Sequence, residues 1–508
     1  MQIIKASIRT IIVIVFFAIA SYITFPMQAA QADVILHAFD WSYQDIADNA
    51  DAIADAGYKA VLVTPPLKSP KKGGCEWYLR YQPQDFRVID NCDGNKESFV
   101  NAIKALDANG VRTYADVVVN HMANERQAAT TFPGDRTLKE YDNNKDYWAK
   151  QILYGDSNGN GVLDNGILPD DGKNDGLFDS SDFHSAKCIS DYNDRNAVIF
   201  DRICGGNGDT GLPDLKDSVP DNNWVNDQRK QYIQALYDLG VRGFRIDAAK
   251  HMPMGAIQYF VPDAVANDSQ IFAEIITSGG TTASDYQLFL NPYLSQLPEQ
   301  FGAYDFPLLN ALKNAFAFGQ PLSDIANPYA TGNALENSRA VTVVVTHDIP
   351  YNDGFRYLIF DESADNSKDE DLAYAYIMGR DGGTPLVFDD RSTGLPKYGG
   401  PSNNERWVGV WKQDMMKNMI DFHNRMQGKP MDVLAADECA LLWRRGEDGI
   451  VGINKCGDER SFTVDTSFKL KWDHPYTDIL TGNPLPEIQG PEYTFKLPAR
   501  SASMWYAE

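Results

Sequence analysis

Three acidic residues stand at or near the ends of apolar stretches that have the composition of buried strands. Asp247 follows Gly243-Phe-Arg-Ile, Glu274 lies in Ile271-Phe-Ala-Glu-Ile-Ile, and Asp348 ends a run that begins at Val341. Arg245 precedes Asp247 by two residues and points to the same side of a strand, where its charge favours the ionised carboxylate that a nucleophile needs. Apolar neighbours would raise the pKa of Glu274 and suit it to acid catalysis. Two carboxyls in different environments are the minimal set for glycoside hydrolysis, although each residue alone could equally cap a helix or pair with an arginine.

Three segments share one pattern, in which a predicted helix is followed by a glycine and then by a run rich in β-branched residues. These segments predict helices and strands that would position the acidic residues. Each glycine stands where a helix would end, and each following run is apolar on both faces, as in a buried parallel sheet. The three segments are 51–63, 102–119 and 232–247, and further predicted strands are 34–40, 271–276, 301–306, 341–348 and 384–390. Eight strands predict a (β/α)8 TIM barrel, whose active site lies at the carboxyl ends of the strands. An open doubly wound sheet is the alternative, but no G-x-G-x-x-G follows the first strand.

Changes in composition divide the chain further. The residues between the third and fourth strands are rich in Asp, Asn and Gly, and short alternating runs begin after about residue 430. We expect an inserted loop-rich subdomain and a C-terminal antiparallel β domain. The expected division is 1–32 (signal peptide), 33–121 and 213–430 (barrel), 122–212 (calcium-binding insert) and 431–508 (C-terminal β-sandwich).

The N-terminus has the features of an export signal. Lys5 and Arg9 precede an apolar run from Ile11 to Ala20, and Ala30-Gln31-Ala32 fits a signal-peptidase site. An uncleaved membrane anchor is the alternative, although the run is short for a span. We expect a secreted or periplasmic monomer that leaves the membrane after cleavage. The net charge of −24 argues against nucleic acid or an anionic membrane surface as a partner.

Six cysteines fall into three local couples, with separations of 17, 16 and 17 residues. Fifteen pairings are possible, but these short separations favour disulfides between members of each couple, and an oxidising compartment would permit them. Buried free thiols are the alternative. The predicted pairs are Cys75–Cys92, Cys188–Cys204 and Cys439–Cys456.

Residues 33 to about 430 resemble the alpha-amylase family of glycoside hydrolases, and the family's motifs occur in their usual order. Asp116-Val-Val-Val-Asn-His121, Gly243-Phe-Arg-Ile-Asp-Ala-Ala-Lys-His251, Phe272-Ala-Glu274 and Val345-Thr-His-Asp348 are similar to the family's four regions. Gly211-Leu-Pro-Asp-Leu215 is similar to its short motif in the inserted domain.

The resemblance implies catalytic roles and a retaining mechanism. Asp247 would be the nucleophile, Glu274 the acid and base, and Asp348 the residue that holds sugar hydroxyls in the distorted ring. Arg245 would orient Asp247, and the cleavage point would contact an aromatic loop after the second strand. The implied substrate-binding residues are Trp77, Tyr78, Tyr81, Gln82, His121, Arg245, Lys250, His251 and His347. The motifs after Asp247 and around Asp214 favour endo-acting hydrolysis of α-1,4 bonds in starch, glycogen or maltodextrins.

Calcium is the cofactor that the resemblance implies. Asn120, Asp214 and the backbone carbonyl of His251 would hold one ion between barrel and insert; a plain Asn–Asp hydrogen bond is the alternative. A second, independent hypothesis comes from Asp156-Ser-Asn-Gly-Asn-Gly-Val-Leu-Asp164, which fits the first nine positions of an EF-hand loop. Its ligands would be Asp156, Asn158, Asn160 and Asp164, unless the segment is only a series of turns.

Chloride is not expected as a cofactor. Thr346 stands where chloride-binding members of the family have an asparagine.

Two other functions remain open at this point. The same residues would serve a glucanotransferase or a maltooligosaccharide-forming hydrolase, and a protein of another class could keep the fold only to bind glycans. Trp443 and Trp472 could bind starch from the C-terminal domain, but we predict that both belong to its core.

Overall fold

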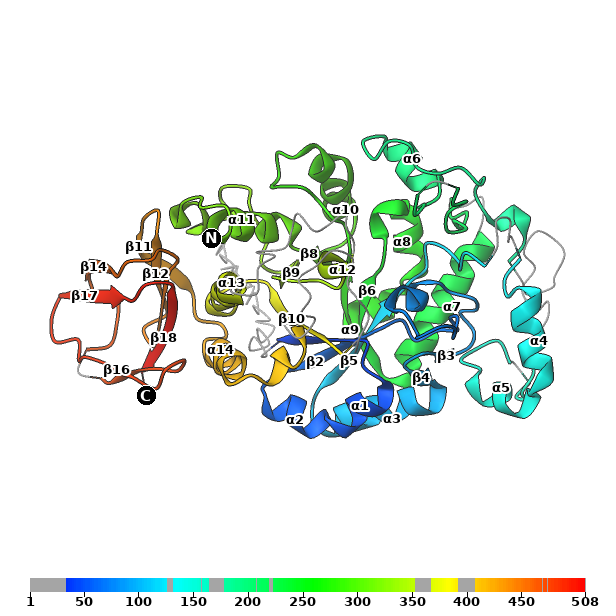
Figure 1. The fold of residues 1–508 in the computed structure, drawn as a ribbon, viewed down its shortest axis with the longest axis horizontal. Coiled ribbons are helices and arrows are strands. Elements are labelled where there is room, and N and C mark those ends of the chain that lie inside the picture. Colours follow the sequence, from blue (N-terminus) through cyan, green and yellow to red (C-terminus); the bar gives the residue numbers. More distant parts are fainter. Residues whose placement is uncertain are drawn as a thin grey trace, which may run out of the picture.

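The computed structural model describes residues 33–125, 131–156, 158–163, 178–206, 208–218, 223–351, 367–391, 407–467, 469–472 and 474–507. It places the barrel in the middle of an elongated molecule, with helices α4 (Asp135–Asn143) and α5 (Lys145–Gln151) at one end and the C-terminal strands at the other (Figure 1). The predicted signal peptide, 1–32, lies outside the described residues. Among the described residues, no helix combines the length and apolar character needed to cross a membrane.

Eight parallel strands close into a barrel in the order β1-β10-β9-β8-β7-β6-β5-β2, which confirms the predicted fold. The ring closes because β1 pairs with both β10 and β2. Four strands end earlier than the predicted 34–40, 271–276, 301–306 and 341–348, because the chain leaves the ladder before its polar residues, which therefore lie beyond the strand ends. The barrel strands are β1 (Ile35–Phe39), β2 (Ala60–Val63), β5 (Arg112–Val117), β6 (Val241–Ile246), β7 (Gln270–Ala273), β8 (Phe301–Tyr304), β9 (Ala340–Val343) and β10 (Thr384–Asp390).

Helices surround this barrel and bury their apolar stripes against it. In α3 (Lys96–Ala108), Phe99, Ala102, Ile103 and Leu106 recur at helical spacing and are buried. Gly240 ends α7 (Asn223–Leu239) at φ +116°, and a Cβ there would lie 2.9 Å from Ile103, so both the backbone and the packing require glycine. The other helices around the barrel are α1 (Tyr43–Asp48), α2 (Ala50–Asp55), α8 (Met254–Phe260), α9 (Asp263–Asp268), α10 (Asn291–Gln296), α11 (Phe306–Phe316), α13 (Ser367–Gly379) and α14 (Asp414–Arg425).

The long connection between β5 and β6 carries α4, α5 and α6 (Arg195–Phe200) before α7 begins. A small hairpin, β3 (Asp90–Asn91) and β4 (Gly94–Asn95), lies earlier in the chain, between β2 and α3. The carbonyl of Gln151 in α5 accepts a hydrogen bond from Ile89 N, so the insert contacts the loop before this hairpin.

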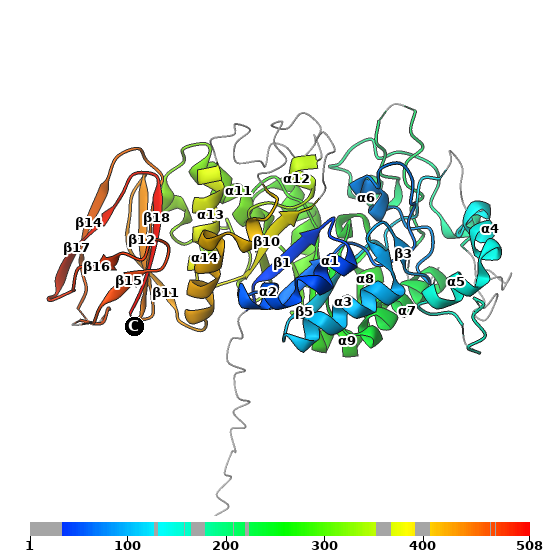
Figure 2. The same ribbon diagram turned by 60° about the horizontal axis from the view of Figure 1, so that its bottom comes forward.

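The C-terminal region is antiparallel, as predicted. Figure 2 shows its strands stacked beside α13 and α14, at the end of the molecule opposite to α4 and α5. The six-stranded sheet has the order β11-β12-β13-β18-β15-β16, and β14 and β17 form a separate pair. The strands are β11 (Met431–Ala436), β12 (Ala440–Arg445), β13 (Gly449–Asn454), β14 (Arg460–Asp465), β15 (Tyr476–Asp478), β16 (Pro484–Leu485), β17 (Glu492–Leu497) and β18 (Ser501–Ala507).

The two tryptophans of this region behave differently. Trp443 is fully buried and donates to the carbonyl of Gly379 in α13, so it joins the two parts of the chain. Trp472 is 40% exposed, and the prediction that it belongs to the core is wrong. It ends the alternating run Phe468-Lys-Leu-Lys-Trp472 between β14 and β15, and the described residues of this run belong to no strand, so the alternation does not place Trp472 on a buried face.

All three predicted disulfides are present. Cys75–Cys92, Cys188–Cys204 and Cys439–Cys456 each join residues that are close in sequence.

Candidate active site

Asp247, Glu274 and Asp348 meet at the carboxyl end of the barrel. Asp247 directly follows β6, Glu274 directly follows β7, and Asp348 opens α12 (Asp348–Tyr351) beyond β9. Arg245 contacts two of them: its Nη1 lies 3.0 Å from Asp247 Oδ1 and its Nη2 lies 2.6 Å from Glu274 Oε1. Asp348 forms a side-chain hydrogen bond with Glu274. Three residues far apart in the sequence thus form one buried carboxyl cluster.

A fourth carboxyl, Asp116, lies beneath this cluster. The parallel register of β5 and β6 places Asp116 beside Arg245, and Nη1 of Arg245 is 2.6 Å from both Asp116 oxygens. Both side chains are fully buried. Sequence reasoning quoted Asp116 as the start of a motif but gave it no role. The signal was available, because an aspartate inside an apolar strand requires a charged partner on a neighbouring strand.

One guanidinium therefore serves several carboxyls, and this changes the expected electrostatics. Burial raises the pKa of Asp247 and of Asp348 well above the usual range, and Arg245 only partly opposes this. Arg245 lies beside Asp247 as expected and favours its ionised form, but its charge is divided among Asp116, Asp247 and Glu274. The walls around Glu274 also differ from the apolar ones predicted, since its carboxyl contacts Arg245 and the backbone N–H of Ala248.

Aromatic rings form one side of the site. His347 is sandwiched between Phe39 and Tyr81, with ring centroids 4.9 and 4.8 Å away. Tyr81 also donates its hydroxyl to Asp116 at 3.0 Å, which fixes its ring over the cluster. Trp77 lies 5.9 Å from the His347 ring, whereas Tyr78 is 42% exposed. The structure thus brings together the aromatic residues that the sequence pattern grouped.

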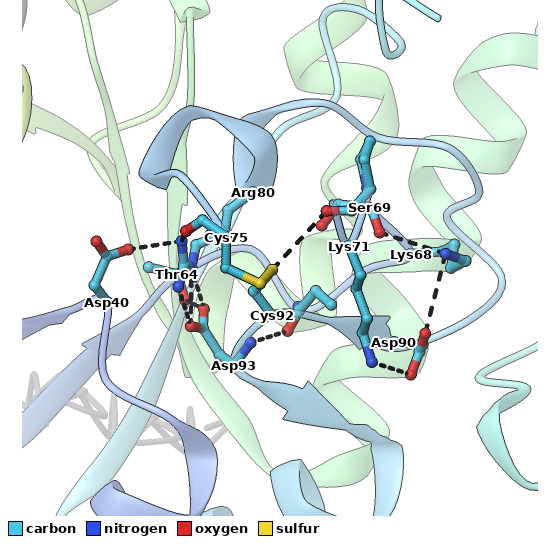
Figure 3. Close-up of a disulfide and its surroundings, with 12 residues drawn as sticks. Asp40, Thr64, Lys68, Ser69, Lys71, Cys75, Arg80, Asp90, Cys92 and Asp93 are labelled. Atoms are coloured by element: carbon cyan, nitrogen blue, oxygen red, sulfur yellow. Dashed lines mark hydrogen bonds and ion pairs between the residues drawn. A yellow bond between two sulfur atoms is a disulfide. The ribbon is translucent and has the colours of Figure 1, made fainter. Parts of the chain in front are cut away.

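Trp77, Tyr78 and Tyr81 belong to the 3₁₀ helix η1 (Trp77–Tyr81), and a polar clamp holds this helix to the barrel. Figure 3 shows Arg80 between Asp93 and Asp40, beside the Cys75–Cys92 disulfide. Arg80 donates to both oxygens of Asp93 at 2.7–2.9 Å, pairs with Asp40 at 2.9 Å and donates to the carbonyl of Cys75 at 3.0 Å. Because Asp40 follows β1, the aromatic helix is tied directly to a barrel strand.

The two polar residues next to the aromatic helix also point inward. His121 donates through Nε2 to the carbonyl of Tyr81 at 3.1 Å, and burial lowers its pKa to about 4. Gln82 accepts from Asn124 N at 3.3 Å. His121 is therefore neutral at pH 7 and acts as a hydrogen-bonding group.

A lysine near the site lies between two rings. Lys250 Nζ lies 5.6 Å from the Tyr192 ring and 5.1 Å from the Phe289 ring. Tyr192 comes from the insert and Phe289 from the π-helix η4 (Tyr286–Leu290), so three separate segments meet here. Sequence reasoning missed both rings, because neither lies in a motif next to a strand end.

The expected calcium ligands lie where the insert joins the barrel. Asn120 Nδ2 donates to Asp214 Oδ1 at 3.0 Å, and His184 Nδ1 lies 2.6 Å from Asp214 Oδ2. His251, in the 3₁₀ helix η3 (Ala249–His251), donates through Nδ1 to the carbonyl of Val198 in α6. Burial raises the pKa of Asp214 well above its usual range, because the carboxylate lies away from water. The buried Asp214 carboxylate and the side-chain amide of Asn120 carry the hard oxygen donors that calcium prefers, and a turn of the amide that exchanges Nδ2 for Oδ1 lets these residues fit the ion.

The second hypothetical calcium loop is only partly described. Asp164 and Ser157 lie outside the described residues. Asp156 accepts from the backbone N–H groups of Asn160 and Gly161, at 3.0 and 2.8 Å. Within the described ranges, no three His, Cys, Asp or Glu side chains gather as metal ligands.

Comparison with known proteins places this architecture in a family. The model of the alpha amylase catalytic domain matches residues 41–287. An alpha-amylase of Aeromonas hydrophila is 43% identical over 486 residues, which cover 95% of this chain and 97% of the relative. The chain belongs to the alpha-amylase family of glycoside hydrolases.

Solved structures agree on the fold. Alpha-amylase I of Eisenia fetida superposes with a TM-score of 0.71 at 22% identity, covering 93% of this chain and 97% of that one. A cyclomaltodextrin glucanotransferase superposes with a TM-score of 0.65, also at 22% identity, covering 94% of this chain and 99% of that one. The 43% identity to an alpha-amylase over nearly the whole chain makes this protein a glycoside hydrolase with alpha-amylase activity, and its substrate is a polysaccharide.

Proposed function

We propose that the protein is an endo-acting enzyme that hydrolyses α-1,4-glucosidic bonds of starch, glycogen and maltodextrins with retention of the α configuration. The observation that supports this most directly is the single guanidinium of Arg245, which contacts both Asp247 and Glu274. Sharing one guanidinium keeps the two carboxyls close. This favours the retaining arrangement, in which they lie about 5–5.5 Å apart, over the wider spacing that leaves room for a water.

In the first step, Glu274 protonates the glycosidic oxygen and Asp247 attacks the anomeric carbon, so that a covalent glycosyl-enzyme replaces the broken bond. The hydrogen bond between Asp348 and Glu274 requires a proton on one of the two, and we assign this shared proton as the one that the leaving group receives. In the second step, Glu274 takes a proton from water, and the hydroxide displaces Asp247. Asp348 then remains to bind sugar hydroxyls.

The side chains around the cluster suggest how the polymer is held. Tyr81, Trp77 and Tyr78 offer ring faces to the C–H surfaces of the sugar, and Gln82, His121 and His347 offer hydrogen bonds. Lys250 and His251 lie on the side from which Tyr192 approaches, and we assign them to the leaving portion of the chain.

Calcium would link the insert to the barrel through Asn120, Asp214 and the His251 carbonyl, and would neutralise the buried Asp214 carboxylate. We further propose that Asp156, Asn158, Asn160 and Asp164 bind a second ion. Chloride is not required in this proposal, since Thr346 offers a hydroxyl where chloride-binding relatives have an amide.

We also propose how the chain is divided into domains and where the protein is located. We propose that 1–32 is removed as a signal peptide and that 33–121 and 213–430 together form the barrel. Residues 122–212 would then form the insert, and 431–508 the C-terminal domain. Three disulfides are consistent with export as a monomer to an oxidising compartment.

A matched pair of variants tests the mechanism. Glu274→Gln should lower starch hydrolysis by about 10²–10⁴-fold, the range for loss of a general acid. In that variant an activated fluorosugar, which needs no acid, should label Asp247, as detected by peptide mass spectrometry. Labelling at another residue, or β-anomeric products from the wild type, would overturn the retaining proposal.

Glucanotransferase activity is the second candidate, because a solved glucanotransferase shares the fold. Incubation with maltoheptaose separates the two. Products that are all shorter than the substrate indicate hydrolysis, whereas longer or cyclic products indicate transfer to a sugar hydroxyl. A protein that only binds glycans would yield no product at all.

A further inference from the structure

A second hollow lies on the outer wall of the barrel, separate from the carboxyl cluster. Its volume is about 600 Å³, within the range of about 300–1,000 Å³ that is usual for small-molecule sites. One of its walls is formed by η4 and α10, and the other by the segment that precedes β9. Its lining includes Thr281, Tyr286, Asn291, Ser295, Tyr329 and Glu336. We call this hollow the wall pocket.

Two tyrosines give the wall pocket its chemistry. Tyr286 is only 8% exposed as a whole, but its hydroxyl is not among the enclosed polar atoms of the described residues and remains open to solvent, with no hydrogen bond to another described residue. Because Tyr286 lines the hollow, this hydroxyl is available to bond a ligand there. Tyr329 is 58% exposed, an unusual position for a large ring. Its ring is therefore accessible for stacking.

The polar groups of the wall pocket suit a neutral ligand. Thr281, Ser295 and Asn291 supply hydroxyls and an amide, and Glu336 supplies the only carboxylate of the lining. Arg339 supplies the only cation, but its guanidinium already donates to the carbonyls of Leu294 and Phe301. An anionic ligand would therefore find no available positive charge among the lining residues. Rings together with hydroxyls and an amide match a polyhydroxylated sugar, which has C–H faces and many hydroxyls.

The wall pocket is connected to the active site through the chain itself. Thr281 follows the catalytic candidate Glu274 by seven residues, and its backbone N–H donates to the carbonyl of Gly332 at 2.7 Å. A Cβ on Gly280 would lie 2.4 Å from that same carbonyl, so only glycine permits this close approach. The loop that leaves Glu274 therefore forms part of the wall pocket.

We propose that the wall pocket binds an α-glucan chain and holds polymeric substrate on the enzyme without taking part in bond cleavage. Tyr329 stacks on a sugar ring, and the Tyr286 hydroxyl bonds to a sugar hydroxyl at the base. This inference rests on the polysaccharide substrate class of the family and not on the catalytic roles proposed above.

Affinity electrophoresis in gels that contain amylopectin tests the proposal. All proteins carry Glu274→Gln, so that the polymer is not digested during the run, and gels without amylopectin give the reference mobility. Tyr329→Ala and Tyr286→Phe should each raise the apparent dissociation constant for amylopectin by about three- to tenfold, the effect of losing one ring contact or one hydrogen bond. Phe318→Ala is the matched control, because Phe318 is a 65% exposed ring outside the wall pocket.

Kinetics on the active enzyme provide the second measurement. With Glu274 restored, Tyr329→Ala should raise KM for amylopectin by a similar factor and leave kcat and KM for maltotriose unchanged. Equal retardation of Tyr329→Ala and the parent protein would overturn the proposal. It would also fail if Phe318→Ala weakened binding as much, or if maltotriose kinetics changed in parallel. None of these outcomes depends on whether Glu274 is the catalytic acid.

Discussion

Arg245 approaches Asp116 as closely as it approaches Glu274: Nη1 lies 2.6 Å from both Asp116 oxygens, and Nη2 lies 2.6 Å from Glu274 Oε1. The guanidinium is thus shared between a carboxylate under the site and carboxyls within it. Burial raises the pKa of Asp116 to about 6, since desolvation outweighs the nearby positive charge. Asp116 therefore adds a negative charge to a cluster in which the single guanidinium of Arg245 already faces several carboxyls.

The first prediction concerns this charge. Asp116→Asn removes a negative charge that helps to raise the pKa of Asp247, so the pKa of Asp247 should fall. The acid limb of kcat/KM should move to lower pH by about one unit, measured with a soluble maltooligosaccharide over a range of pH. At the optimum, kcat should drop by about tenfold, because Arg245 loses the group that fixes its orientation.

Asp85→Asn is the control for that experiment. Asp85 is also buried and pairs with Arg87 at 2.9 Å, but it lies in the loop after β2 that faces the insert. Its loss should lower stability and leave the pH profile in place. An unchanged acid limb in Asp116→Asn would contradict the role assigned to Asp116.

The second prediction concerns the disulfide beside η1. Removing Cys75–Cys92 by paired Cys→Ser substitutions should lower the free energy of unfolding by about 3 kcal/mol, as for other loops of this length. It should also raise KM for maltoheptaose by about fivefold with little change in kcat, because Trp77 and Tyr81 lose part of their support. Urea unfolding and steady-state kinetics measure the two effects.

Cys439–Cys456 is the matched control, since it has the same separation of 17 residues and lies in the C-terminal region. Its removal should lower stability by a similar amount and leave KM unchanged. If both double variants alter KM equally, the Cys75–Cys92 disulfide has no specific effect on the aromatic helix η1.

Much of the fold and of the site could be predicted from the sequence. Buried parallel strands are apolar on both faces, so the runs around Val61, Ile246 and Phe272 were recognisable, and polar residues at their ends marked the site. Local cysteine spacing identified the three disulfides. These features all depend on residues that are neighbours along the chain.

The features that sequence reasoning missed depend on contacts between distant segments. Asp116 and Arg245 are 129 residues apart, and only the β5–β6 register brings them together. Lys250 lies between Tyr192 and Phe289, whose positions depend on how the insert and η4 pack.

The third prediction concerns calcium. Dialysis against a chelator should lower the melting temperature by about 5 °C, because an ion bound at Asn120 and Asp214 stabilises the folded state only. Asp214→Asn should lower the melting temperature without chelator and should respond little to chelator. Equal chelator sensitivity of Asp214→Asn and wild type would place the ion elsewhere.

Calorimetric titration of the chelated protein separates the two proposed calcium sites. Asp156→Ala should reduce the number of calcium ions bound by one and leave the Asp214 site unaffected. An unchanged stoichiometry would remove the second site.

The fourth prediction concerns His37 on β1, which is fully buried against Phe39, His347 and Phe388. Burial, aided by Arg245, lowers its pKa from 6.5 to about 3. The unfolded chain therefore takes up a proton as the pH falls below 6.5, whereas the folded protein does so only near pH 3. The stability that depends on neutral His37 is complete above pH 6.5 and is lost as the pH falls, by about 2 kcal/mol between pH 7 and pH 5.

His37→Asn removes this titration, so its free energy of unfolding, measured in urea, should fall by about 2 kcal/mol less than that of wild type between pH 7 and pH 5. At pH 7 the variant is expected to be the less stable protein, because it leaves a gap among packed rings. The same substitution at the exposed His474 should leave the difference between the two pH values as in wild type. An identical pH dependence in His37→Asn and wild type would mean that His37 is not kept neutral by its surroundings in the barrel.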